Sequence, residues 1–153
     1  MRLKRNLFPM NKLKVIFLCF AFLSCEKVQE TTIPLTRVYL EIDLAYRDKD
    51  LFALLCQKAI TQPRTASEST GFGGVLVVHG FDDIYYAYDL ACPLEANRSV
   101  CLTPLDDGTA MCNSCGTVFD TAYGTGTPLS GASQYPLRKY LVSGSGSVLY
   151  VTN

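Results

Sequence analysis

Four cysteines lie within a span of 24 residues, and this cluster constrains the fold more than any other feature of the sequence. The stretch holds Cys92, Cys101, Cys112 and Cys115, in a chain that has seven cysteines in all. Such a density indicates a shared role, either as a disulfide framework or as ligands of one inorganic centre. Cys92 precedes a proline, whereas Cys112 and Cys115 enclose a two-residue turn that is closed by a glycine. The pattern predicts two loops that present sulfur to a common point.

The segments around the cluster read as short strands separated by Gly-rich turns. Residues 38–44 alternate apolar and polar side chains with the period of two that is typical of a half-buried strand. Residues 75–79 and 84–90 flank a turn at 80–83 and predict a hairpin, and a closing strand is expected over 147–152. The sequence therefore predicts an all-β domain, either a small sandwich or a barrel.

One stretch departs from this strand pattern. Leu51, Leu54 and Leu55 recur at helical spacing, and Asp48 or Asp50 stands where a helix cap is expected. One short helix is therefore predicted near residues 50–60.

The N-terminal residues have the features of a bacterial export signal. Lys12 and Lys14 precede an apolar run over 15–23, which is too short to cross a bilayer because a spanning helix needs roughly 20 apolar residues. The run ends in Leu23-Ser24-Cys25, which resembles the lipobox of bacterial lipoproteins, where the cysteine is acylated. Met10 is the more natural start of translation, since the residues before it add only a second basic patch.

These features predict a signal peptide over 1–24, a lipid-anchored polar tether over 25–35 and one folded domain over 36–153. Two alternatives stay open: a buried core helix over 15–24, or an ordinary thiol at Cys25 behind a conventional signal peptide. Acylation of Cys25 would tether the domain to a bacterial membrane, on its periplasmic or cell-surface face. Such a compartment permits disulfides.

The charge distribution argues against a nucleic-acid partner. Residues 25–153 carry nine basic and fourteen acidic side chains, although the whole chain is formally neutral. A protein that binds phosphates needs a basic surface, which this domain lacks by composition. The expected partners are the membrane, through the lipid anchor, and a protein or redox partner that the sequence does not identify.

The cysteine loops and their flanks resemble the Rieske [2Fe–2S] domain family, from about Thr36 to the C-terminus. Members of that family carry Cys-x-His in one loop and Cys-x-x-His-Gly in a second. Here Cys92-Pro93-Leu94 is followed by 17 residues and then by Cys112-Asn113-Ser114-Cys115-Gly116, a spacing similar to the family's. "GTVFD" and "PLSGASQYPLRKYLV" resemble the segments that follow the second loop. The resemblance implies a β-sandwich with a small two-loop, zinc-ribbon-like subdomain.

The sequence departs from the family at the ligands. Leu94 stands at the place of the first histidine and Cys115 at the place of the second. A Rieske cluster needs two imidazoles on its outer iron. The single histidine, His79, lies in the predicted strand before the first loop. The resemblance therefore implies a degenerate member without a histidine-ligated cluster.

Three states of the cysteine site remain open: a bound zinc ion, a disulfide and a [2Fe–2S] cluster. One zinc ion could use Cys92, Cys112, Cys115 and Cys101, because zinc accepts four thiolates in tetrahedral geometry. A disulfide between Cys92 and Cys112 could join the loops and leave Cys115 to pair with Cys101 or stay free. A [2Fe–2S] cluster could be held by cysteines alone. Disulfides are favoured here because the expected compartment is oxidising and export would not require prior assembly of a cluster.

The sequence contains no recognisable catalytic set. One strand histidine does not complete a Ser/His/Asp or Cys/His arrangement, and the chain is too short to add the separate catalytic domain of an oxygenase. We therefore predict that the chain is not an enzyme but a structural or interaction module. The alternative is an iron–sulfur electron-transfer protein with cysteine ligands.

Overall fold

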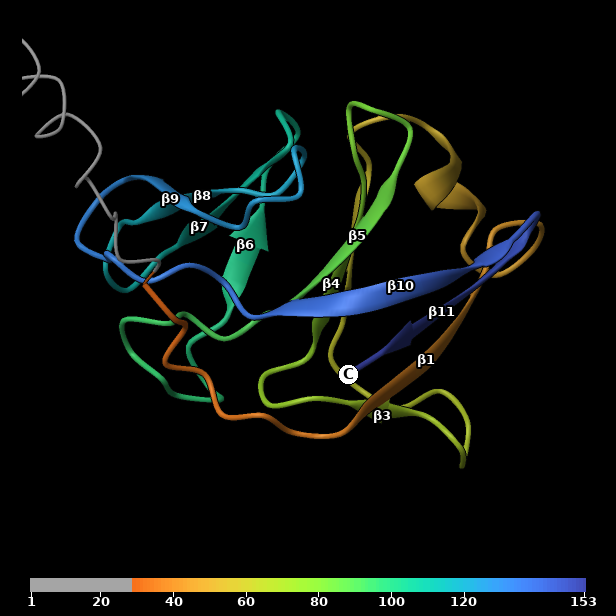
Figure 1. Ribbon diagram of the computed structural model, residues 1–153, viewed down its shortest axis with the longest axis horizontal. Coiled ribbons are helices and arrows are strands. Elements are labelled where there is room, and N and C mark those ends of the chain that lie inside the picture. Colours follow the sequence, from red (N-terminus) through yellow and green to blue (C-terminus); the bar gives the residue numbers. More distant parts are fainter. Residues whose placement is uncertain (1–28) are drawn as a thin grey trace, which may run out of the picture.

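The computed structural model describes residues 29–153, so the predicted signal peptide and Cys25 lie outside the described residues. Within this range the chain forms eleven strands in two antiparallel sheets (Figure 1). The large sheet has the strand order β2-β4-β5-β10-β11-β1-β3, and the small sheet has the order β6-β7-β8-β9. The predicted all-β architecture, with a small subdomain built around the two loops, is confirmed.

The strand bounds follow the predicted runs closely. The large sheet contains β1 (Val38–Asp43), β2 (Gln57–Ile60), β3 (Ser69–Thr70), β4 (Val75–His79), β5 (Tyr85–Asp89), β10 (Lys139–Ser145) and β11 (Val148–Thr152). The small sheet contains β6 (Leu102–Pro104), β7 (Thr109–Cys112), β8 (Val118–Asp120) and β9 (Pro128–Ser130). The predicted hairpin is β4–β5, and the predicted closing strand is β11, which lies between β1 and β10.

The large sheet curves so that its two halves face each other around a first core. Leu40 and Ile42 of β1 are fully buried and belong to one cluster with Val75 and Val77 of β4. Three strands, β5, β10 and β11, lie between β4 and β1 in the sheet. Contacts between β1 and β4 therefore require the sheet to fold over itself. The result is a sandwich made largely from one continuous sheet.

Strand β4 is buried on both faces, and its second face carries the small sheet. Leu76 and Val78 alternate with the valines of the first core and join a second cluster with Phe119 of β8. This explains why β4 reads as an unbroken apolar run, since a strand that is covered on both sides has no polar face. Cys92 and Cys112 belong to the same second cluster. The loop cysteines are therefore packed into the interface between the two sheets.

The helix predicted near residues 50–60 is absent from the described chain; the prediction was wrong. Only a single 3-10 turn forms, over Lys49–Phe52, and β2 follows it. Leu55 has a φ of +64°, a left-handed conformation that no α-helix continues through. Residues 57–60 pair with β4 in register, from Gln57↔Val78 to Ile60↔Val75. Pairing with the edge of β4 satisfies this backbone more completely than a short isolated helix would. No helix among residues 29–153 is long and apolar enough to cross a membrane.

Ordered contacts begin before residue 36, where the sequence places the start of the domain. Ile33 is fully buried, and its carbonyl accepts a hydrogen bond of 2.6 Å from Nε of Arg138. The Thr32 hydroxyl donates to the carbonyl of Pro93, in the first cysteine loop. The end of the expected tether therefore runs against this loop.

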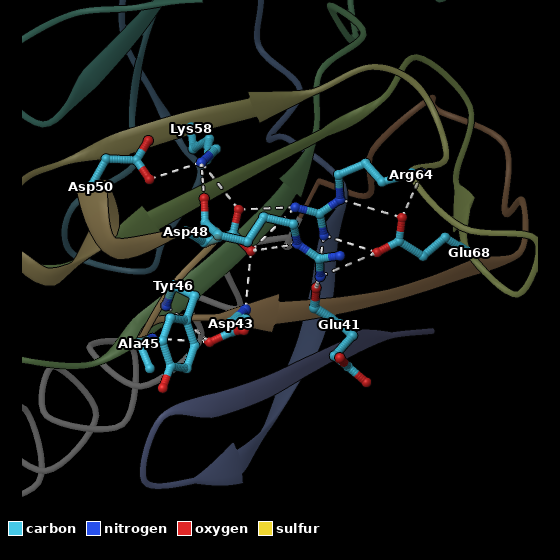
Figure 2. Close-up of polar contacts among 10 residues, drawn as sticks. Glu41, Asp43, Ala45, Tyr46, Asp48, Asp50, Lys58, Arg64 and Glu68 are labelled. Carbon is cyan, nitrogen blue, oxygen red and sulfur yellow. Dashed lines mark hydrogen bonds and ion pairs between the residues drawn. The ribbon is translucent and has the colours of Figure 1, made fainter.

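A cluster of opposite charges, which we call the ion network, connects β1, the 3-10 turn, β2 and the loop after β2 (Figure 2). Its centre is the carboxylate of Asp48, whose side chain is fully buried and lies 2.9 Å from Arg64 and 3.0 Å from Lys58. Arg64 also pairs with Glu68 at 2.9 Å, and Lys58 with Asp50 at 2.8 Å. The network fixes two irregular segments against the sheet by polar contacts.

Candidate metal centre

The two predicted loops meet and bring three sulfur atoms together. Cys92 follows β5, Cys112 ends β7, and Cys115 lies in the turn to β8. Their Sγ atoms all lie within 4.8 Å of one another, and those of Cys92 and Cys115 are 3.6 Å apart. All three are free thiols in the structure. We call these cysteines the three-thiol group.

The fourth predicted cysteine, Cys101, lies outside the three-thiol group. Its Sγ contacts the carbonyl oxygens of Gly73, at 3.4 Å, and Arg98, at 3.3 Å. Cys101 forms an isolated bridge with Ala91 just before β6, so its backbone is fixed alongside the first loop. The expectation that Cys101 completes a four-cysteine zinc site, or pairs with Cys115, does not agree with this placement.

The buried carboxylate of Asp89 fixes the start of the first loop. It accepts backbone N–H bonds from Phe72 (2.9 Å), Gly73 (3.0 Å) and Ala91 (2.8 Å), and it also accepts the hydroxyl of Tyr140. A carboxylate that collects this many donors holds its neighbours firmly, because each bond to a charged acceptor is stronger than a neutral one. Burial, followed by the Asp89 hydrogen bond, raises the pKa of Tyr140. Cys92 is thereby positioned three residues beyond a rigid strand end.

The second loop is a tight turn that depends on a glycine. The Gly116 N–H donates to the Cys112 carbonyl at 2.8 Å, and the Cys112 N–H donates to the Thr117 carbonyl at 2.9 Å. Gly116 has a φ of +71°, and nothing lies within 4 Å of where its Cβ would be. The left-handed backbone, rather than crowding, therefore favours glycine at this position.

The environments of two thiols differ in a way that matters for ionisation. Burial is the main reason that the pKa of Cys92 rises to about 12, although the amides of Glu95 and Leu94 act in the opposite direction. Burial would also raise the pKa of Cys115, but hydrogen bonds from the Thr117 hydroxyl and amide and the adjacent thiols outweigh it and lower that pKa. Cys115 therefore ionises more readily than Cys92.

Thr117 is a site residue that sequence reasoning missed. Its Oγ1 lies 3.2 Å from the Cys115 Sγ and accepts the Ser133 N–H at 2.9 Å. The neutral Cys115 thiol donates to this oxygen, and once Cys115 is ionised the Thr117 hydroxyl can donate to the sulfur instead. The available signal was a hydroxyl residue directly after the Cys-Gly pair.

Glu95 was also missed. Its Oε1 accepts a hydrogen bond of 3.0 Å from the Ser114 hydroxyl, in the turn between the two cysteines of the second loop. This contact connects the two loops outside the three-thiol group. The available signal was the position of Glu95, three residues after Cys92.

The residues present do not fit a histidine-ligated iron–sulfur cluster. Leu94, at the position of the first expected histidine, is 39% exposed and offers no ligand atom. His79 ends β4, where its ring bonds to the Phe52 carbonyl at 3.1 Å and to Asp83 at 2.8 Å. Cys92 follows the opposite end of β5, so His79 is separated from it by the length of that strand.

The spacing of the sulfurs suits a single small cation. Two thiolates about 2.3 Å from a tetrahedral zinc are about 3.8 Å apart, close to the 3.6 Å between Cys92 and Cys115. A two-iron cluster distributes its ligands over both irons, so some of its thiolates lie farther apart than two ligands of one ion. Three sulfurs that are all within 4.8 Å of one another therefore match one ion better than two.

Comparisons with known proteins do not assign this chain to a family. No family model matches the sequence. No curated protein matches it either. Among solved structures, a chain of a carbazole 1,9a-dioxygenase complex of reduced oxygenase and oxidized ferredoxin is similar, with 17% identity and a TM-score of 0.48. The match covers 76% of this chain and 94% of that chain. At that degree of likeness the match assigns neither a cofactor nor an activity.

Proposed function

We propose that this chain is an exported lipoprotein with a Rieske-like domain that acts as a non-catalytic structural or interaction module. In this proposal Cys92, Cys112 and Cys115 hold the two loops together by binding one zinc ion. The observation that carries the proposal is the convergence of three sulfur atoms from two loops within 4.8 Å.

Zinc is preferred over a disulfide because it engages all three sulfurs. A disulfide between any two of them would leave the third as a half-buried or buried free thiol in an oxidising compartment. Zinc also takes up the charge of thiolates, which is otherwise costly at buried cysteines such as Cys92 and Cys112. The spacing of the sulfurs supports the same choice.

Metal and thiol analysis of protein purified from its own membrane tests this proposal. We expect about one zinc per chain, as for a structural zinc site, and loss of fold stability on chelation. Metal-free protein with fewer free thiols before reduction than after it would overturn the zinc assignment in favour of a disulfide. Brown protein that contains iron and acid-labile sulfide would instead favour the electron-transfer alternative.

The lipid anchor would keep the cysteine loops close to the membrane. Thr32, which contacts the first loop at Pro93, is only the seventh residue after Cys25. A segment of that length reaches at most about 25 Å when fully extended. We therefore propose that the module works at the membrane surface, where the loops face either lipid or a membrane-bound partner.

Replacing Cys25 with serine tests the anchor separately from the metal. The Cys25→Ser variant should accumulate as unprocessed or soluble protein and retain zinc after purification. Unchanged membrane fractionation and processing would contradict acylation at this position.

A further inference from the structure

The two cysteine loops share one backbone pattern despite their different sequences. In the first loop the Ala96 N–H donates to the Cys92 carbonyl at 2.9 Å, and in the second the Gly116 N–H donates to the Cys112 carbonyl at 2.8 Å. Both donors lie four residues after the cysteine and both have a left-handed backbone, with φ of +46° at Ala96 and +71° at Gly116. The match places "CPLEA" on "CNSCG", residue for residue.

Turns of this kind hold a metal with the first and fourth residues of each loop, as in Cys-x-x-Cys zinc knuckles. In the second loop these are Cys112 and Cys115. In the first loop they are Cys92 and Glu95.

Glu95 thus occupies the position in the first loop that Cys115 occupies in the second. Its carboxylate already reaches across to the second loop, where it accepts the Ser114 hydroxyl at 3.0 Å. The Glu95 oxygens lie outside the group of ligand atoms within 4.8 Å of one another, but the side chain is exposed and can turn about its own bonds toward the sulfurs. Carboxylate oxygens bind zinc at roughly 2.0–2.2 Å, and mixed donor sets are common in zinc sites.

Other side chains near the three-thiol group do not offer a free ligand atom to a metal there. Leu94 has no donor atom, and Cys101 directs its sulfur at the carbonyls of Gly73 and Arg98. Asn113 donates to the Thr103 hydroxyl at 2.8 Å, on the side of β6. Within the described chain, Glu95 is the acidic side chain that hydrogen bonds bring to the second loop.

We propose that Glu95 is the fourth ligand of the metal, so that Cys92, Cys112, Cys115 and Glu95 form a tetrahedral Cys₃Glu zinc site. This inference rests on the proposed function, because it takes zinc as the occupant of the three-thiol group. The Ser114 hydroxyl then holds the carboxylate beside the second loop before metal arrives. The two loops would contribute two ligands each, as the shared backbone pattern implies.

Metal titration of the reduced, full-length protein in detergent tests the proposal. The probes are Zn²⁺, in competition with a coloured chelator, and Co²⁺, whose visible spectrum reports the number of thiolates around the ion. The variant Glu95→Gln keeps the size of the side chain and should lower zinc affinity by at least about tenfold, given that even partners outside the ligand set cost 10–100-fold. Glu95→Cys should restore tight binding and shift the Co²⁺ spectrum toward that of four thiolates.

Glu41→Gln is the matched control, because Glu41 is an exposed glutamate on β1, outside the cysteine loops. It should bind zinc and cobalt as the unchanged protein does. Wild-type affinity and spectrum in Glu95→Gln, together with lost binding in Cys112→Ser, would overturn the role of Glu95 and leave the zinc site standing. Failure of the unchanged reduced protein to bind either metal would overturn the proposed function itself.

Discussion

The ion network and the three-thiol group both fix irregular loops to a sheet with buried polar atoms, but they differ in charge. In the ion network, the buried carboxylates of Asp48 and Glu68 face the guanidinium of Arg64 at 2.9 Å each. Opposite signs alternate, so both carboxylates find their partners within the chain. The three-thiol group contains only acids of one kind, which gain charge of the same sign when they ionise.

This difference indicates which region depends on something outside the chain. The ion network needs only its own residues, and it should respond to pH and to substitutions that unpair a charge. The three-thiol group carries no charge as neutral thiols, but its ionised form requires a cation and its oxidised form requires an oxidant. The loop region should therefore respond to chelators and reductants, whereas the network region should not.

The largest effect is expected from Cys112→Ser. Cys112 is fully buried in the second core and contributes one of the three sulfurs. Its replacement should abolish stoichiometric metal binding and lower the free energy of unfolding by about 2–4 kcal/mol, as loss of a loop-closing crosslink commonly does. Denaturant unfolding combined with metal analysis measures both.

Cys56→Ser is the control for this substitution. Cys56 is a half-buried free thiol that lies outside the three-thiol group. It should retain metal and lose less than about 1 kcal/mol, the usual outcome away from a core or a ligand site. An equal loss of stability and metal in both variants would remove the special role of the loops.

Arg64→Met tests the ion network in the same way. It removes the closest cation of Asp48 and Glu68, whose side chains are 0% and 1% exposed, and leaves Asp48 with Lys58 at 3.0 Å and both carboxylates with Arg47 at 3.4 and 3.7 Å. Unpairing a buried charge completely costs about 3–5 kcal/mol; because other cations remain and the Arg64 side chain is 21% exposed, we expect about 2–3 kcal/mol. Metal content should stay unchanged. The exposed Arg37, which forms no ion pair within the described chain, provides the control Arg37→Met, expected within about 0.5 kcal/mol.

The sequence predicted much of the large sheet and the meeting of the loops, because these depend on local patterns. The alternation of apolar and polar side chains along residues 38–44 indicates a strand with one buried face, and the unbroken apolar run over 75–79 indicates a strand with both faces buried. The spacing of Cys92, Cys112 and Cys115 was sufficient to predict that their sulfurs converge. The strand periodicity is fixed over a few residues and the cysteine spacing over 24, so both can be recognised within one short stretch of the sequence.

The errors and omissions concern contacts between distant segments. The leucine spacing near residues 50–60 predicted a helix, but residues 57–60 instead pair with the open edge of β4 as a strand. Arg64 and Glu68 lie in a stretch whose composition indicates only a loop, and nothing local reveals that both meet Asp48. Glu95 lies three residues after Cys92, but this spacing becomes meaningful only when the backbones of the two loops are seen to match.

Acid should weaken the ion network by a smaller amount than Arg64→Met. Burial raises the pKa of Asp48, but the Asp43 amide, Lys58 and Arg64 outweigh it, so this pKa lies below its ordinary value. Arg64 likewise overcomes the burial of Glu68 and lowers its pKa. A lowered folded-state pKa contributes stability above the ordinary carboxyl range, and this stability is lost as the pH falls below about 4.

Unfolding by denaturant at several pH values between neutral and acid measures this loss. Thiolates also take up protons in acid, so the informative quantity is the difference between the unchanged protein and Asp48→Asn. The variant should be less stable at neutral pH and should show a shallower decline with acid. Parallel declines in the two proteins would indicate that Asp48 contributes nothing to the acid response.

The smallest effect is expected from Asp50→Asn, at the rim of the same network. The Lys58 Nζ lies closer to Asp50, at 2.8 Å, than to Asp48, at 3.0 Å. Distance alone would therefore rank the Asp50 pair as the stronger one. The Asp50 side chain is 59% exposed, however, whereas that of Asp48 is fully buried, so water and salt screen the first pair and barely reach the second. Asp50→Asn should cost about 0.2–1 kcal/mol at low salt and almost nothing at about 1 M salt. Lys58→Met removes both pairs and should keep most of its larger cost at high salt. Equal salt dependence of the two variants would show that burial does not separate the rim of the network from its centre.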